Sequence, residues 1–248
     1  MPVPSRDIDT MKRLLIHLIM GCTVLMPLAS RAATDTDPFE GLNRGIYQFN
    51  KVVDDYFLKP IATAYKTILP WPLTKGISNF YSNLNQIPII CNDLLQFELY
   101  QATSDSWRFA INSTIGIFGL VDVASHIGLE KNTEDFGLTL AKWGYNSSAY
   151  LVLPILGPST VRDAIGLPVD YELFSVYPQI ASADRRHILL GLNIINQRAN
   201  LLEYDDVMKH AALDPYSFQR NAYLQRRAYL IEQNKPQNNE LDVEDDKT

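Results

Sequence analysis

The sequence has no excess of basic residues and almost no cysteine. Its 248 residues include 22 Lys and Arg against 28 Asp and Glu, a formal net charge of -6, and only two cysteines. A general nucleic-acid binder needs a basic surface, so the charge excludes that class. It also argues against attachment to anionic lipid through a polybasic patch. The cysteine count excludes a disulfide-rich secreted scaffold.

Catalytic and cofactor motifs are missing too. The chain has no G-x-S-x-G element and no phosphate-binding glycine loop. His126, His187 and His210 lack the close His, Cys or Glu companions that zinc spacing requires. We expect Ser159 to cap a turn, and Asp122 to cap or hydrogen-bond backbone rather than act as an acid with a raised pKa. The sequence therefore predicts a non-enzymatic protein without metal or cofactor.

The N-terminus has the pattern of a secretory signal peptide, which we assign to residues 1–32. Lys12 and Arg13 precede an almost wholly apolar run over residues 14–28, which is too short for a comfortable bilayer span. Cleavage after Ala32 is one outcome. The other is lipid attachment at Cys22, because residues 19–22 (Ile-Met-Gly-Cys) resemble a lipobox.

Helical periodicity dominates the rest of the chain. Asp37 is expected to cap a first helix that ends or kinks at Lys59-Pro60. Further helices are expected after the turn at residues 70–72 and stopping near Pro88, then over 92–97, 104–120 and 183–210, and after Pro215; residues 150–156 are expected to be extended or a short helix. We predict one all-α domain over residues 33–231, with irregular Gly- and Pro-rich connections. Residues 232–248 are expected to form a disordered acidic tail.

The segment from residue 111 to 129 has an unusual composition, because Asp122 is its only charged residue. It is either a buried helical hairpin, which we favour, or a helix whose apolar face meets lipid. Arg220, Arg226 and Arg227 on the last helix could bind lipid phosphates, although a solvated basic face is the preferred interpretation. The 13 Tyr and 10 Phe residues suit either a membrane interface or ordinary core packing.

Ordered sequence blocks across residues 37–231 resemble the MlaA (VacJ) family. The blocks are Asp37-Pro38-Phe39-Glu40-Gly41-Leu42-Asn43-Arg44 with Tyr47, Phe49 and Asn50; Ser78-Asn79-Phe80 with Asn83-Leu84; Asn112-Ser113-Thr114 with Gly116, Gly119 and Asp122-Val123-Ala124; Phe136-Gly137 with Thr139-Leu140 and Trp143-Gly144; Leu153-Pro154 with Gly157-Pro158-Ser159-Thr160 and Arg162-Asp163; and Asp214-Pro215-Tyr216 with Arg220, Tyr223 and Gln225-Arg226. Several blocks in family order are far more specific than any one of them.

The resemblance implies a helical, ring-like protein in the inner leaflet of the outer membrane, facing the periplasm, with an amphipathic channel through its centre. It also implies association with trimeric porins. Phospholipids that have strayed into the outer leaflet would be removed and passed to a soluble periplasmic carrier, which preserves lipid asymmetry. A porin-binding scaffold and, less favoured, a phospholipid hydrolase are the alternatives.

We place the channel wall in residues 116–122 and 136–158, where glycines allow close backbone approach. The residues assigned to it are Gly116, Gly119, Asp122, Phe136, Gly137, Pro154, Gly157 and Pro158.

Overall fold

The structure is a computed structural model that describes residues 37–205 and 213–234. Cys22, the cleavage position after Ala32, and His210 lie outside the described residues. The prediction of an all-α domain is confirmed, with one short β-hairpin as the exception.

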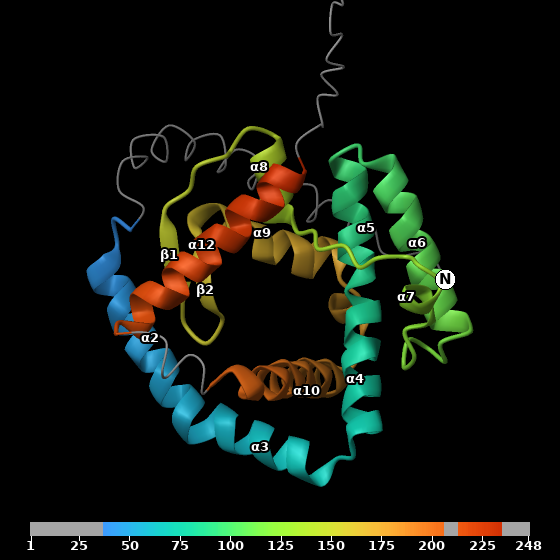
Figure 1. Cartoon of the computed structure of the whole chain (residues 1–248), viewed down its shortest axis with the longest axis horizontal. Coiled ribbons are helices and arrows are strands. Elements are labelled where there is room, and N and C mark those ends of the chain that lie inside the picture. The colour runs from blue at the N-terminus through green and yellow to red at the C-terminus, as the bar shows by residue number, and fades with distance from the viewer. Residues whose placement is uncertain (1–36, 206–212, 235–248) are drawn as a thin grey trace, which may run out of the picture.

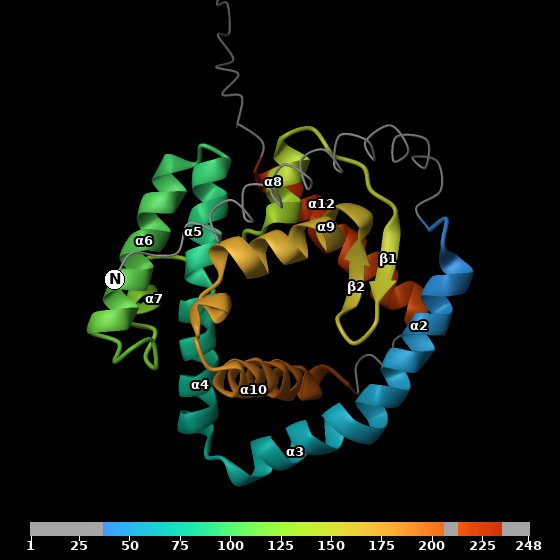
Figure 2. The ribbon, with the colours of Figure 1, turned by 180° about the vertical axis from the view of Figure 1, so that it is seen from behind.

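The elements run around a ring from the first helix to the hairpin, and the later ones return along it (Figures 1 and 2). In chain order they are α2 (Glu40–Val53), the π-helix η2 (Asp54–Leu58), α3 (Lys59–Ile68), α4 (Trp71–Leu84), α5 (Gln86–Leu95), α6 (Leu99–Thr114), α7 (Val123–His126), α8 (Phe136–Lys142), β1 (Tyr150–Leu153), β2 (Gly157–Thr160), α9 (Val161–Val169), the π-helix η3 (Asp170–Phe174), the 3-10 helix η4 (Tyr177–Gln179), α10 (Ala183–Leu201), the 3-10 helix η5 (Leu202–Tyr204) and α12 (Pro215–Gln233). The hairpin and α12 lie between α2 and α9, so they join the N-terminal arc to the rest of the ring. α10 lies within the arc formed by α3 and α4 and contacts both helices.

The first helix does not begin with the predicted cap and does not end at Lys59-Pro60; the alternative of a kink there stays a prediction. α2 begins at Glu40 without a side-chain cap, because the buried Asp37 carboxylate instead accepts hydrogen bonds from Asn43, Tyr216 and Arg220. At Lys59-Pro60 the helical path continues from α2 through η2 into α3. The π-helix η2, in which the Lys59 N–H bonds the Asp54 carbonyl five residues back, lies directly before Pro60 and accommodates the proline within the continuing helical path.

Of the next two helix boundaries, both predicted from prolines, one is confirmed and one is wrong. The predicted turn at residues 70–72 is confirmed, since Pro70 precedes α4 and Pro72 lies in its first turn. The predicted stop near Pro88 is wrong: α4 ends at Leu84, and Pro88 lies in the first turn of α5, where a missing N–H costs no intrahelical bond.

The preferred interpretation of residues 111–129 as a buried helical hairpin is wrong. α6 ends at Thr114, and residues 115–121 form an irregular loop in which Ile117 and Phe118 are 59% and 78% exposed. Both have left-handed backbones, with φ of 53° and 54°, a conformation that costs a β-branched residue such as Ile117 free energy. The apolar residues of this loop therefore face outward.

The hairpin lies on α2 and on the last helix. β1 pairs antiparallel with β2, with Tyr150 opposite Thr160 and Leu153 opposite Gly157, so the extended alternative for the start of residues 150–156 is confirmed. Tyr150 and Val152 pack with Tyr216 of α12 in a small hydrophobic core. α12 runs to Gln233, two residues into the segment predicted as a tail, and residues 235–248 lie outside the described residues.

Candidate functional site

The burial pattern of the described residues is close to inverted. Polar and charged side chains outnumber hydrophobic ones among the buried residues, and two of the largest fully buried side chains are Arg108 and Arg162. Many large hydrophobic side chains are exposed instead, far beyond the scattered examples that a water-soluble surface shows. The described part of the protein therefore presents apolar side chains on its surface and holds polar and charged side chains in its interior.

The exposed apolar surface is contributed by several elements. It includes Leu42, Val52, Tyr56, Phe57 and Ile68 on α2, η2 and α3; Trp71 and Leu73 on α4; Phe97, Leu99, Tyr100 and Trp107 around α5 and α6; and Ile115, Ile117, Phe118 and Ile127 in and after the 115–121 loop. An apolar groove of about 470 Å³ lies between α2 and the hairpin, lined by Gly41, Leu42, Gly45, Ile46, Phe49 and Pro154. Among the described helices, none has the length and apolar character needed to cross a bilayer.

A second cavity is polar and lies between α4 and α10; we call it the α4–α10 cavity. Its volume is about 300 Å³, and its lining residues are Ser78, Tyr81, Ser82, Leu84, Asn85, Pro88, Ser175, Val176, Tyr177, Asn193, Asn196, Gln197 and Asn200. None of these described residues carries a charge. The cavity can therefore hydrogen-bond a polar group, but it cannot neutralise an ion.

Helical spacing explains why amides and hydroxyls gather there. Ser78, Ser82 and Asn85 recur at four- and three-residue steps along α4, and Asn193, Asn196, Gln197 and Asn200 do the same along α10, so each set lies on one helical face. The sequence prediction missed these residues. It followed the apolar positions of the α10 segment and overlooked the polar positions between them.

The first three residues assigned to the channel lie in and after the 115–121 loop. A Cβ at Gly116 would lie 2.2 Å from the carbonyl oxygen of Val121, and a Cβ at Gly119, whose φ is +87°, would lie 2.6 Å from the Asn83 Cβ. Asp122 caps α7 by accepting a hydrogen bond from the Ser125 N–H, which confirms the prediction that Asp122 caps or hydrogen-bonds backbone.

The ionisation of Asp122 is also decided by its neighbours. Burial alone would raise the pKa of Asp122, but hydrogen bonds from Ser125, Asn112 and Lys131 outweigh burial and hold that pKa well below its usual range. Asp122 also lies 3.2 Å from the buried Arg108 guanidinium. It is therefore a structural anion, and the hypothesis of an acid with a raised pKa is wrong.

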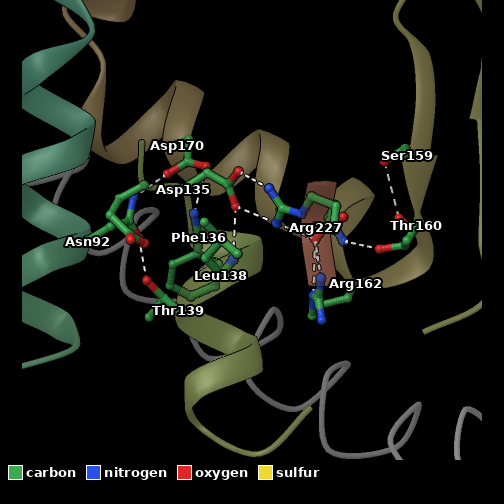
Figure 3. Close-up of polar contacts among 12 residues, drawn as sticks. Asn92, Asp135, Phe136, Leu138, Thr139, Ser159, Thr160, Arg162, Asp170 and Arg227 are labelled. Atoms are coloured by element: carbon green, nitrogen blue, oxygen red, sulfur yellow. Dashed lines mark hydrogen bonds and ion pairs between the residues drawn. The ribbon is translucent and has the colours of Figure 1, made fainter. Parts of the chain in front are cut away.

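Phe136 (Figure 3) and Gly137 begin α8, which contacts α9 and α12. The Phe136 N–H donates to the Asp170 carboxylate at 2.9 Å. A Cβ at Gly137 would lie 2.3 Å from the Asp163 Oδ1 and 2.9 Å from the Arg227 guanidinium, so only glycine leaves room for that ion pair. The two residues thus lie beside the polar network that anchors the last helix.

The other three assigned residues belong to the hairpin. Pro154 lines the apolar groove, Gly157 adopts a φ of +85° after the turn, and Pro158 lies opposite Val152. The eight residues assigned to the channel thus fall in three places, and none of them lines the α4–α10 cavity. Their role as a channel wall stays a prediction.

The last helix is held by ion pairs rather than displaying a free basic face. Arg227 donates to Asp135 and to the buried Asp163 at 2.5 Å and 2.7 Å, and Arg220 donates to Asp37 at 3.1 Å (Figure 3 shows Arg227 and Asp135). Only Arg226 of the three arginines is exposed without a recorded ion pair in the described residues. The predicted solvated basic face is wrong for Arg220 and Arg227.

Two smaller predictions concern Ser159 and the histidines. Ser159 does not cap the turn after β2; the Thr160 hydroxyl accepts the Asp163 N–H there, because Thr160 is the residue at the start of α9 (Figure 3). His126 contacts the Asp122 carbonyl oxygen. The described residues contain no cluster of His, Cys, Asp or Glu able to hold a metal ion.

Buried carboxyl groups lie on α5, on the segment before α8 and at the start of η3. Burial, followed by the charges of Asp105 and Glu134, raises the pKa of Asp93 to about 8. Burial likewise raises the pKa of Glu134 to about 7 and that of Asp170 to about 6, against hydrogen bonds that favour the charged forms. These carboxyl groups hold protons at pH values where exposed ones are ionised.

Comparison with known proteins places this ring in a family. The sequence profile of the family described as "MlaA lipoprotein" matches residues 35–230. The chain belongs to the MlaA lipoprotein family. The resemblance seen in the sequence blocks is thereby confirmed.

Relatives within the family are similar over most of their length. The chain is 36% identical over 242 residues to "Intermembrane phospholipid transport system lipoprotein MlaA" of Shigella flexneri, covering 92% of this chain and 94% of that protein. The Escherichia coli K12 protein of the same name is 35% identical over 241 residues, with the same coverage. A solved structure described as "Structural basis for maintenance of bacterial outer membrane lipid asymmetry" superposes with a TM-score of 0.69 at 33% identity, covering 79% of this chain and 98% of that one.

Proposed function

We propose that this MlaA-family chain is the outer-membrane component of an intermembrane phospholipid transport system. It removes phospholipids that have strayed into the outer leaflet, through an amphipathic channel in its ring, and passes them to a soluble periplasmic carrier while associated with a trimeric porin. The proposal is supported by the names of the Shigella and Escherichia relatives, which assign those proteins to an intermembrane phospholipid transport system, and by the solved homologue, whose description concerns outer-membrane lipid asymmetry.

The inverted burial pattern is the observation that carries this proposal. A phospholipid has a polar headgroup and apolar chains, and its transfer is slow because an unpaired polar group is costly in hydrocarbon. The exposed apolar surface of this ring can contact acyl chains, while the amides and hydroxyls that line the α4–α10 cavity can hydrogen-bond a headgroup. The described chain therefore has the two kinds of surface that a lipid conduit needs, in one body.

The first experiment measures lipid content and membrane asymmetry together. The full-length protein, extracted from its own membranes, is expected to co-isolate with intact phospholipid. A deletion strain is expected to accumulate outer-leaflet phospholipid without a change in lysophospholipid, and wild-type complementation is expected to restore asymmetry. Lipid-free protein whose loss leaves asymmetry intact would establish the scaffold alternative.

A single variant separates transport from hydrolysis. Ser159 is the serine considered for a nucleophile, and its buried hydroxyl donates to the Thr160 carbonyl oxygen. Ser159→Ala is expected to complement the deletion fully, because transport needs no nucleophile. Loss of complementation by a Ser159→Ala protein that accumulates and melts like wild type, with lysophospholipid falling in parallel, would favour the hydrolase.

A further inference from the structure

Asn196 is a buried amide whose donor end has no partner in the described protein. The residue is 2% exposed and lies on the face of α10 that lines the α4–α10 cavity. Its Oδ1 accepts hydrogen bonds from the Ser78 hydroxyl at 2.9 Å and the Tyr65 hydroxyl at 3.3 Å. No hydrogen bond from its Nδ2 to any described residue is present, and this nitrogen is not sealed away from the cavity.

The hydrogen bonds of Ser78 go with one orientation of the Asn196 amide. The Asn200 Nδ2 donates to the Ser78 hydroxyl oxygen at 3.1 Å, so the Ser78 proton remains available for Asn196. The Asn196 oxygen is thereby held toward α3 and α4, and its two N–H groups are left for the cavity. Because this nitrogen faces the cavity and has no partner among the described residues, it can donate to an acceptor oxygen from outside the chain.

We propose that the α4–α10 cavity binds the phosphodiester and ester oxygens of a phospholipid, with Asn196 Nδ2 as the principal donor. This inference rests on the proposed function for the source of the ligand. The volume of about 300 Å³ lies at the lower end of the range for small-molecule sites, so it suits a headgroup with its glycerol rather than a whole lipid.

The uncharged lining determines which headgroup charges the cavity can distinguish. Arginine or lysine would hold an anionic headgroup tightly, and a carboxylate would attract an ammonium group. Neither is present among the lining residues, which supply only amides, hydroxyls and apolar groups. The cavity therefore binds the part that all phospholipids share and does not select on the net charge of the headgroup.

Isosteric substitution of the donor tests this assignment in the full chain. Asn196→Asp keeps the acceptor oxygen for Ser78 and Tyr65 but replaces the N–H donors with a carboxylate oxygen that repels phosphate. Asn221→Asp, the same change at an exposed position on α12, is the matched control. The probes are dihexanoyl phosphatidylethanolamine, dihexanoyl phosphatidylglycerol and inorganic phosphate, with binding measured by titration calorimetry.

The expected result is comparable affinity for the two lipids, within about threefold. Asn196→Asp is expected to weaken both by about tenfold or more, since one hydrogen bond to a charged group is lost. Asn221→Asp is expected to bind as wild type does, and inorganic phosphate alone is expected not to bind. Unchanged binding by Asn196→Asp, a strong preference for one headgroup charge, or binding of phosphate without lipid would each overturn the assignment.

Photo-crosslinking covers the case in which Asn196→Asp does not fold. A photoreactive amino acid at Gln197, which lines the cavity and is exposed, is expected to capture phospholipid, whereas one at Gln225 on α12 is expected to capture much less. Equal capture at both positions would overturn the cavity assignment. If wild-type protein co-isolates with phospholipid but the photoreactive residue at position 197 captures none, the cavity assignment is overturned and the proposed function stands. If wild-type protein holds no phospholipid and does not preserve asymmetry, the proposed function is overturned as well.

Discussion

Replacing Arg227 with methionine should destabilise the ring strongly. Arg227 is buried on α12 and donates to both Asp135 and Asp163, so the change leaves Asp135 without its cation and Asp163 with Arg162 alone (Figure 3 shows Arg227, Asp135 and Arg162). Breaking a buried ion pair on one side costs about 3–5 kcal/mol. The Asp135 side chain is 36% exposed and is screened by water, whereas that of Asp163 is 9% exposed, so we take the lower end, about 3 kcal/mol.

Thermal unfolding in detergent, followed by circular dichroism, gives the measurement. For a domain of this size, about 3 kcal/mol corresponds to a fall in Tm of about 6–12 °C. Arg226→Met removes the same charge one residue earlier from an exposed position and is expected to shift Tm by less than about 2 °C. Equal Tm values for the Arg227→Met and Arg226→Met proteins would refute the reasoning.

The pH dependence identifies the cause. Burial alone would raise the pKa of Asp135, but the hydrogen bond and charge of Arg227 outweigh it and keep that pKa below its usual value. A carboxylate with a lowered pKa contributes stability above its ordinary pKa of about 4, and this contribution is lost as the pH falls. The Tm difference between wild type and Arg227→Met should therefore narrow below about pH 4; a constant difference would point to lost packing instead.

Two further predictions concern backbone conformation and a buried carboxyl group. Gly119→Ala should lower the unfolding free energy by more than about 1 kcal/mol, because the φ of Gly119 is +87° and a Cβ there would collide with Asn83. Gly41→Ala on α2, where the Cβ meets open space, should raise the unfolding free energy by up to about 1 kcal/mol. Thermal unfolding followed by circular dichroism measures both. Burial, followed by the charge of Asp105, raises the pKa of Asp93 to about 8. The folded protein therefore keeps a proton on Asp93 that the unfolded chain loses above about pH 4, so wild-type stability should decline as the pH rises from about 4 to 8. Asp93→Asn should remove this part of the decline, which is measured as Tm at pH 5, 7 and 9. An unaltered slope in Asp93→Asn would show that another group titrates.

Local signals predicted the boundaries that local chemistry sets. Pro70 before α4 and Pro215 at the start of α12 were identified because a helix start depends on a few neighbouring residues. Asp214, directly before Pro215, accepts the Tyr216 N–H. Pro88 misled the prediction because proline is acceptable in a first turn as well as after a last one. Sequence alone does not say which of the two applies.

Longer-range features were beyond local reasoning. Apolar residues of the 115–121 loop have the same composition whether they face a protein core or a membrane, so the buried interpretation was favoured and was wrong. Arg227 looked like a surface charge because its partners, Asp135 and Asp163, are 92 and 64 residues away. The polar stripe on α10 was visible in the sequence, but only its position against α4 makes it one side of a cavity.

The contact between Asp37 and the last helix has a consequence for how the chain reaches its native state. Asp37 receives the Tyr216 hydroxyl at 2.5 Å and the Arg220 guanidinium at 3.1 Å, across 179 and 183 residues of sequence. A chain synthesised from its N-terminus holds this carboxylate without those partners until α12 has been made. Contacts of such high sequence separation slow folding, so joining the two ends of the ring is a late event. In a chain that stops before Pro215, the contacts between α2 and the hairpin still hold the N-terminal arc to the rest of the ring, but the buried Asp37 carboxylate lacks both partners from α12.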